Sequence, residues 1–182
     1  TRMLTLVFGH TVFSVSVVLA AFMAGLGFGS YLFGYAVDKL STNSIDSSST
    51  ALQLYGWIEI MIFASGAVLS LLFANFAEIY SLFHSAVPES PPIQNLLKVI
   101  FSFTLILVPT TFMGATLPLI SKYCVMDSKR IGTQVSLLYA LNTLGAASGC
   151  MITGFFLMGT FGVLQTVLMA AACNLLIGIS AL

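Results

Sequence analysis

Long apolar stretches alternate with short polar ones along the chain. Each apolar stretch holds about 20 residues or more, enough for a helix to cross the hydrocarbon core of a membrane. A transmembrane β-barrel would instead show segments of roughly ten residues with alternating polarity. The pattern therefore predicts five membrane-spanning helices, over residues 11–36, 52–76, 95–121, 131–158 and 162–182.

Composition supports the same class of protein. Hydrophobic residues make up 58% of the chain and charged residues 7%, whereas soluble domains carry about 25% charged residues. So few charges cannot cover a surface that faces water. We therefore expect an all-α, polytopic membrane helix bundle forming a single transmembrane domain over residues 1–182, with the lipid bilayer as its surroundings. A net charge of zero without a basic tract excludes nucleic acid as a partner.

The first ten residues, "TRMLTLVFGH", are too short to span a membrane. We expect them to be the end of a missing first helix or an interfacial segment. With such a helix the full domain has six spans. The chain then corresponds to the ordered part of something longer.

Basic residues near the helix ends predict the orientation. Lys39, Lys122, Lys129 and Arg130 flank the 37–51 and 122–130 loops, which fall on the same side of the membrane. The opposite side carries Arg2 and Lys98. Cytoplasmic loops are enriched in Lys and Arg, so loops 37–51 and 122–130 are predicted to be cytoplasmic.

Two prolines interrupt the third apolar stretch, in "PTTFMGATLPLI". Pro109 and Pro118 lack an N–H, and each frees the carbonyl one turn earlier. We expect a helix break around Pro109, Gly114 and Pro118, with a kink near Pro109 and an unwound segment or helix end near Pro118. Nearby threonine hydroxyls are expected to satisfy the freed backbone. A fold-defining kink and a ligand-handling break both fit this pattern.

Small residues recur at a spacing of four in two stretches. Gly25 and Gly29 lie in the first, and Gly145 and Gly149 in the fourth. This spacing places them on one helix face and lets neighbouring backbones approach closely. We interpret them as helix-packing glycines, with a substrate path lined by backbone as the alternative. In a six-span domain these helices are second and fifth, which correspond in a three-plus-three inverted repeat.

Four polar residues are candidates for ligand contact or for polar helix packing. Glu59 is an acidic residue inside an apolar run, about 10 Å along a helix that starts near residue 52. An ionisable group in a membrane is by default a functional hypothesis, although reaching the interface or pairing with Lys39 would also explain it. Asn142 and Tyr139 lie near the middle of the fourth stretch, and Thr116 lies between the two prolines.

The sequence holds none of the motifs of a soluble active site. It lacks a phosphate-binding glycine loop and a G-x-S-x-G motif. Its three cysteines form no C-x-x-C pair, and His10 and His84 are isolated. We therefore expect no catalytic residue, no cofactor and no metal ligand within this chain.

A set of motifs carries a family resemblance. "GYAVDK" resembles part of the cytoplasmic loop motif of major facilitator transporters, so the bundle is expected to be half-major-facilitator-like. The order of "YGWIEI", "PTTFMGATLPLI", "RIGTQVSLLYALNTLGAASG" and "GFFLMGTFG" resembles the transmembrane domain of membrane-bound spermidine synthase-like proteins. The resemblance implies a cytosolic polyamine aminopropyltransferase domain, which is absent from this chain and would carry the catalytic residues.

Three functions follow as hypotheses. The resemblance implies a membrane anchor or scaffold for an aminopropyltransferase-like domain. The alternatives are a transporter, or transporter remnant, for a small cation such as a polyamine, and a structural subunit of a larger membrane complex. The last requires other membrane helices or subunits as partners.

Overall fold

The computed structural model describes residues 11–41, 47–75, 91–124 and 131–182. These residues are almost entirely helical, and no strand lies among them. The elements in chain order are α2 (Thr11–Ser41), α3 (Ser47–Ala74), α5 (Pro91–Cys124), α6 (Ile131–Ile152), the π-helix η2 (Thr153–Leu157), α7 (Met158–Thr160) and α8 (Gly162–Ala181).

The prediction of a polytopic membrane helix bundle is confirmed. Five helical segments of the described chain are long and apolar enough to cross a membrane: Val15–Lys39, Ser49–Leu72, Val99–Cys124, Ile131–Thr160 and Gly162–Ala181. The protein is therefore a multi-pass integral membrane protein. The predicted segment 1–10 lies outside the described residues.

The helices extend further into polar sequence than predicted. α2 continues to Ser41 and α3 already begins at Ser47, so both flanks of the predicted 37–51 loop are helical. α5 likewise begins at Pro91 rather than near residue 95, because proline fits the first turn of a helix, where its missing N–H has no partner to lose. Polar residues at these ends do not stop a helix, since they lie beyond the hydrocarbon core, where water can satisfy them.

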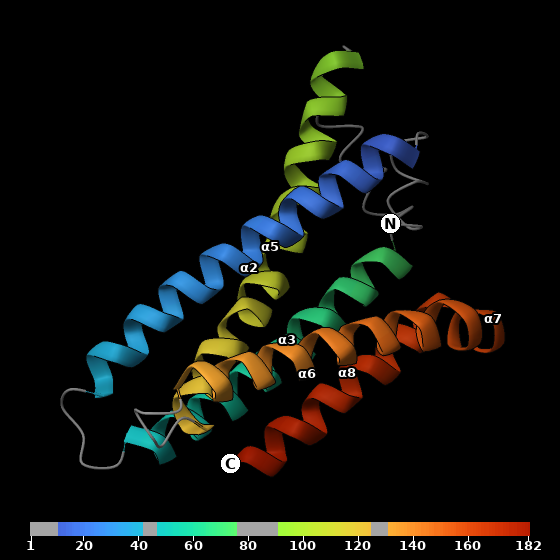
Figure 1. Ribbon diagram of the computed structural model, residues 1–182. Helices are drawn as coiled ribbons and strands as arrows, with labels where there is room; N and C mark the ends of the chain where they lie inside the picture. Colours follow the sequence, from blue (N-terminus) through green and yellow to red (C-terminus); the bar gives the residue numbers. More distant parts are fainter. Residues whose placement is uncertain (1–10, 42–46, 76–90, 125–130) are drawn as a thin grey trace.

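α5 is the central helix of the bundle. It packs against α2 on one side and α3 on the other, and α8 packs against α3 (Figure 1). Contacts between α2 and α5 advance together along both sequences, from Gly25 with Thr110 to Asp38 with Lys122, so the two helices run parallel. Contacts between α3 and α8 run in opposite directions, with Gly56 beside Gly178 and Gly66 near Ala171. These two helices are antiparallel.

α6 stands apart from this packed set. It contacts α5 to a small extent and otherwise continues into η2, and none of its residues is buried. The helix widens into the π-turn of η2, and α7 ends at Thr160, so the predicted single helix over 131–158 includes a π-helical segment near its end. α8 begins at Gly162, whose φ is 77°, a backbone conformation that residues other than glycine rarely adopt.

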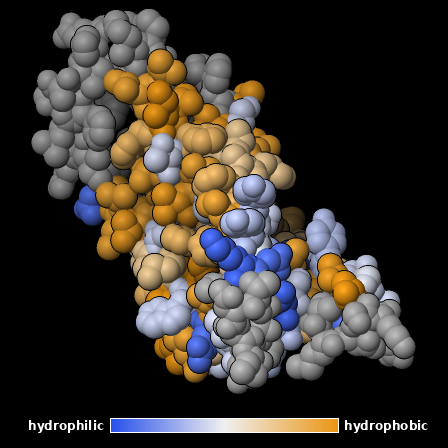
Figure 2. Space-filling view, turned by 90° about the vertical axis from the view of Figure 1, so that its left-hand side faces the viewer, coloured by the Kyte–Doolittle hydropathy of each residue, from blue (hydrophilic) through white to orange (hydrophobic). Residues whose placement is uncertain are grey.

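The hydrophobic core joins the three central helices. Val37 of α2, Ile58 and Ile62 of α3, and Ala115 and Leu119 of α5 are buried together. Most large apolar side chains outside this cluster are exposed, as lipid-facing residues are. Figure 2 looks onto the end of the bundle where α2 ends and α3 begins, and shows hydrophilic residues gathered low on this face beneath an apolar surface.

The expected helix end near Pro118 is wrong. α5 continues as one helix through Pro109 and Pro118 to Cys124. Proline removes one backbone hydrogen bond, but a membrane helix tolerates this when neighbouring groups satisfy the backbone. The kink near Pro109 stays a prediction.

Candidate functional site

The closest approach between two helix backbones lies where α2 crosses residues 109–118 of α5, the segment between the two prolines. A Cβ atom built on Gly25 would overlap the side chain of Thr110, and one on Gly29 would overlap the carbonyl oxygen of Thr111. In return, a Cβ on Gly114 would overlap the backbone of Leu26. The two backbones therefore interlock, with glycine supplied by both helices. Such close approach is how membrane helices gain dispersion contacts where lipid offers no hydrophobic driving force.

Thr110 adds a polar element to this contact. Its side chain is 5% exposed, and its Oγ1 lies 2.8 Å from the carbonyl oxygen of Ile106 on its own helix. The same oxygen lies 3.4 Å from the carbonyl oxygen of Ala21 on α2. The hydroxyl is thus shared between its own helix and the neighbouring one.

The threonines do not satisfy the two carbonyls that the prolines free. The hydroxyl of Thr111 donates to Leu107 O at 2.7 Å, and that of Thr116 donates to Met113 O at 2.7 Å. The freed carbonyls belong to Leu105 and Gly114. The threonines therefore bond the carbonyls three and four residues before them, which is the usual reach of a threonine hydroxyl in a helix.

A second close contact was not predicted from the sequence. A Cβ on Gly56 of α3 would lie 2.9 Å from the carbonyl oxygen of Gly178 on α8, and a Cβ on Gly178 would lie 2.9 Å from Gly56 O. Neither glycine has a small residue four positions away to form a recognisable stripe. The available signal was only that each glycine stands inside an apolar run.

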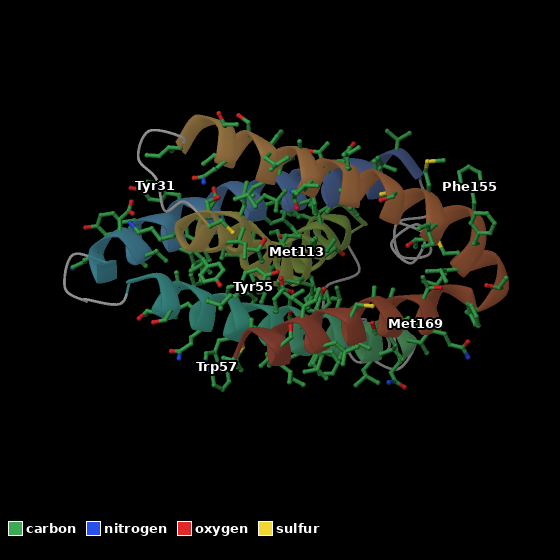
Figure 3. The ribbon with its side chains drawn as sticks, turned by 60° about the horizontal axis from the view of Figure 1, so that its bottom comes forward. Tyr31, Tyr55, Trp57, Met113, Phe155 and Met169 are labelled. Carbon is green, nitrogen blue, oxygen red and sulfur yellow. The ribbon has the colours of Figure 1, made fainter. Side chains whose placement is uncertain are left out.

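Glu59 lies beside this second contact. Its side chain is 6% exposed, and its Cβ would lie 3.2 Å from a Cβ on Gly178. Tyr55 lies one turn earlier on the same face of α3. Tyr55 points into the bundle, where it packs against the core cluster, whereas Trp57 points outward and is 55% exposed (Figure 3).

Glu59 lies further along its helix than the sequence indicated. α3 begins at Ser47 rather than near residue 52, so Glu59 lies about 18 Å along the helix at 1.5 Å per residue. It falls near the middle of the spanning segment Ser49–Leu72. The depth of its carboxyl below the membrane interface stays a prediction.

The remaining candidates lie on helices other than α3. Asn142 and Tyr139 lie exposed on α6, and Thr116 lies on α5. Cβ atoms built on Gly145 and Gly149 would meet no atom of the described chain within 4 Å. The structure thus brings Gly25 and Gly29 against α5 but leaves the α6 glycines without a neighbour, and it does not gather the four polar candidates around one path.

Charged residues gather at one end of the α2–α5 pair. Lys122 Nζ lies 3.3 Å from Asp38 Oδ1, in an ion pair whose lysine side chain is 35% exposed and whose aspartate is 76% exposed. The ends of α2 and α5 that lead into residues 42–46 and 125–130 therefore lie on the same side of the bundle. Lys129 and Arg130, which also entered the orientation argument, lie outside the described residues.

These features define a multi-pass membrane protein with an interlocked helix pair and a buried intramembrane carboxyl. Within the described segments, no three His, Cys, Asp or Glu side chains group as a metal site requires. Cys124, Cys150 and Cys173 are free thiols. No protein-family model, curated protein or solved structure matches the chain.

Proposed function

We propose that the chain is a membrane anchor and scaffold, the membrane part of a spermidine synthase-like protein whose aminopropyltransferase-like domain lies outside it. The observation that carries this proposal is the interlock of Gly25 and Gly29 with the 109–118 segment of α5. The same segment is the most specific part of the family resemblance. Backbones in direct contact form a rigid unit, which suits a platform better than an element that must open and close.

The orientation belongs to the same proposal. We place the ends at Ser41, Ser47, Cys124 and Ala181 in the cytoplasm, where Lys39 and Lys122 satisfy the enrichment of basic residues. A soluble domain joined after Leu182 would then face the cytoplasm.

Two experiments test this scaffold. The coding sequence beyond Leu182 should encode an aminopropyltransferase-like domain, and membranes holding the full-length product should transfer aminopropyl groups to a polyamine acceptor. A reading frame that stops at Leu182 refutes the anchor role. Separately, a protease-sensitive reporter fused after Leu182 should be cut only when protease reaches the cytoplasmic face of sealed vesicles; cutting from the outer face refutes the orientation.

A small-cation transporter is the alternative that the mid-span position of Glu59 favours. In this function Glu59 is the counter-charge for a polyamine-like cation. Proteoliposomes holding the chain should then take up labelled polyamine, and Glu59→Gln should abolish the uptake. Asp38→Asn, which changes an exposed carboxylate at the bundle end, is the matched control. Equal uptake by wild type and Glu59→Gln removes Glu59 from the mechanism.

A structural subunit of a larger membrane complex is the alternative that α6 favours. None of its residues is buried, and its hydroxyl side chains and the amide of Asn142 are exposed. Purification in mild detergent tests this function. A stoichiometric second component supports it, and a monomer without one counts against it.

A further inference from the structure

Glu59 lies where a charged side chain is most costly. It is near the middle of a membrane-spanning segment and 6% exposed. An ionised carboxylate at the centre of a bilayer must be paired, hydrated or neutralised, since the uncompensated charge costs several kcal/mol. Its surroundings therefore determine which of these three holds.

The two helices in contact at Glu59 provide no cation that could pair with its carboxylate. α3 and α8 contain no Lys, Arg or His. On the other packed helices, the basic residues stand near helix ends, and Lys122 is already bound to Asp38. The titratable or charged groups of the described helices packed against α3 are Tyr31, Tyr35, Asp38, Lys39, Lys98, Lys122, Tyr123, Cys124 and Cys173.

Tyr55 lies one turn before Glu59 on the same face of α3, within reach of a hydrogen bond. A phenol both donates and accepts a hydrogen bond, and so does a protonated carboxyl. The pair can thus be satisfied without any charge. Tyr55 also packs against the core cluster, which holds this partner in place.

The space between α3 and α8 next to the Cβ of Glu59 is small. Gly56 and Gly178 bring the backbones of α3 and α8 so close that a single added Cβ would lie 2.9 Å from a carbonyl oxygen. A metal ion or an organic ammonium at this point would require further oxygen ligands and room for them. A proton requires neither.

We propose that Glu59 is an intramembrane proton-binding site, held as a neutral carboxylic acid between α3 and α8 with Tyr55 as its hydrogen-bond partner. The site binds a proton from bulk water in the carboxylate form and releases it only when the α3–α8 contact admits water or a cation. This inference goes beyond the scaffold role and stands whether or not a synthase domain follows the chain.

Infrared spectroscopy tests the proposal directly. The chain is reconstituted in phosphatidylcholine vesicles with glutamate labelled by ¹³C at the side-chain carboxyl, and spectra at pH 7 are compared between wild type and Glu59→Gln. A glutamate in water is ionised at this pH. We expect the wild type to show the carbonyl stretch of a protonated acid and the variant to lose it. Loss of a carboxylate band in the variant instead overturns the proposal.

Two further measurements keep the test decisive if Glu59→Gln fails to insert. Tyr55→Phe removes the hydrogen-bond partner but keeps the acid, so the acid band should persist at a shifted frequency; a wild type without an acid band at pH 7 contradicts the proposal by itself. In addition, a water-soluble carbodiimide should modify the exposed Asp38 and spare Glu59. Modification of Glu59 to the same extent as Asp38 shows that water and the reagent reach its carboxyl freely, and overturns the proposal.

Discussion

Gly29 of α2 lies directly against the backbone carbonyl of Thr111 on α5, and no side chain fits between them. Two residues earlier, Gly27 faces open space, with no atom within 4 Å of an added Cβ. One helix thus holds a glycine that packing requires and a glycine that it does not.

The first prediction compares alanine at these two positions. Gly29→Ala should lower the free energy of unfolding by about 1–3 kcal/mol, because the added methyl group separates the helices. Gly27→Ala should be neutral or stabilise by about 0.5–1 kcal/mol, since alanine favours helix where space allows. Unfolding of the purified protein in mixed detergent micelles measures both. Equal effects at the two sites contradict the interlock.

The hydroxyl of Thr110 should contribute to the same contact. Thr110→Val keeps the side-chain shape but removes the oxygen that lies 3.4 Å from Ala21 O. We expect a loss of about 0.5–1.5 kcal/mol, in the range of single polar contacts between membrane helices. Thr104→Val is the matched control, because that exposed hydroxyl bonds only to Ile100 O of its own helix among the described contacts. If Thr104→Val loses as much stability as Thr110→Val, the contact between Thr110 and Ala21 contributes nothing.

The contact between α3 and α8 gives a similar pair of variants. Gly56→Ala places a Cβ 2.9 Å from Gly178 O and about as close to Leu182, so α8 must shift. We expect a destabilisation of about 1–3 kcal/mol. Gly66→Ala on the same helix meets Ala171 at an ordinary 4.0 Å and should be tolerated. Thermal unfolding in detergent compares the two, and a tolerated Gly56→Ala would mean that the helices are not in contact there.

The sequence predicted the class of fold and the helices, and it did so through uniform physical signals. Apolar runs of spanning length have no other stable state in a membrane. The helix ends were less predictable, because polar residues such as Asp38 and Ser47 neither favour nor forbid helix once the chain has left the hydrocarbon core.

Which helices touch was beyond the sequence. Gly25 and Gly145 carry the same local signal, yet Gly25 meets α5 whereas a Cβ on Gly145 would meet nothing in the described chain. Gly56 and Gly178 carry almost no signal but pack closely. The position of Glu59 along its helix was also misjudged, since it depends on where α3 begins. Tertiary packing determines which helices contact one another, and the spacing of residues along a single helix does not show it.

The ion pair at the bundle end should matter little for stability. Lys122 and Asp38 are 3.3 Å apart, but the aspartate is 76% exposed, and exposed pairs contribute about 0–1 kcal/mol. Asp38→Asn should therefore change the free energy of unfolding by less than about 1 kcal/mol, measured at low and high salt. A larger loss that disappears in high salt would show a stronger electrostatic role than the exposure implies.

The same two positions provide the most direct test of the central claim, that α2 and α5 form a parallel, interlocked pair at the centre of the bundle. In a background with the three native cysteines replaced by serine, Asp38→Cys is combined with Lys122→Cys or with Leu97→Cys, which lies 25 residues earlier on α5 and about 38 Å away along it. Mild oxidation in native membranes should cross-link the 38–122 pair and leave the 38–97 pair free. Cross-linking of 38–97, or of neither pair, would contradict this arrangement.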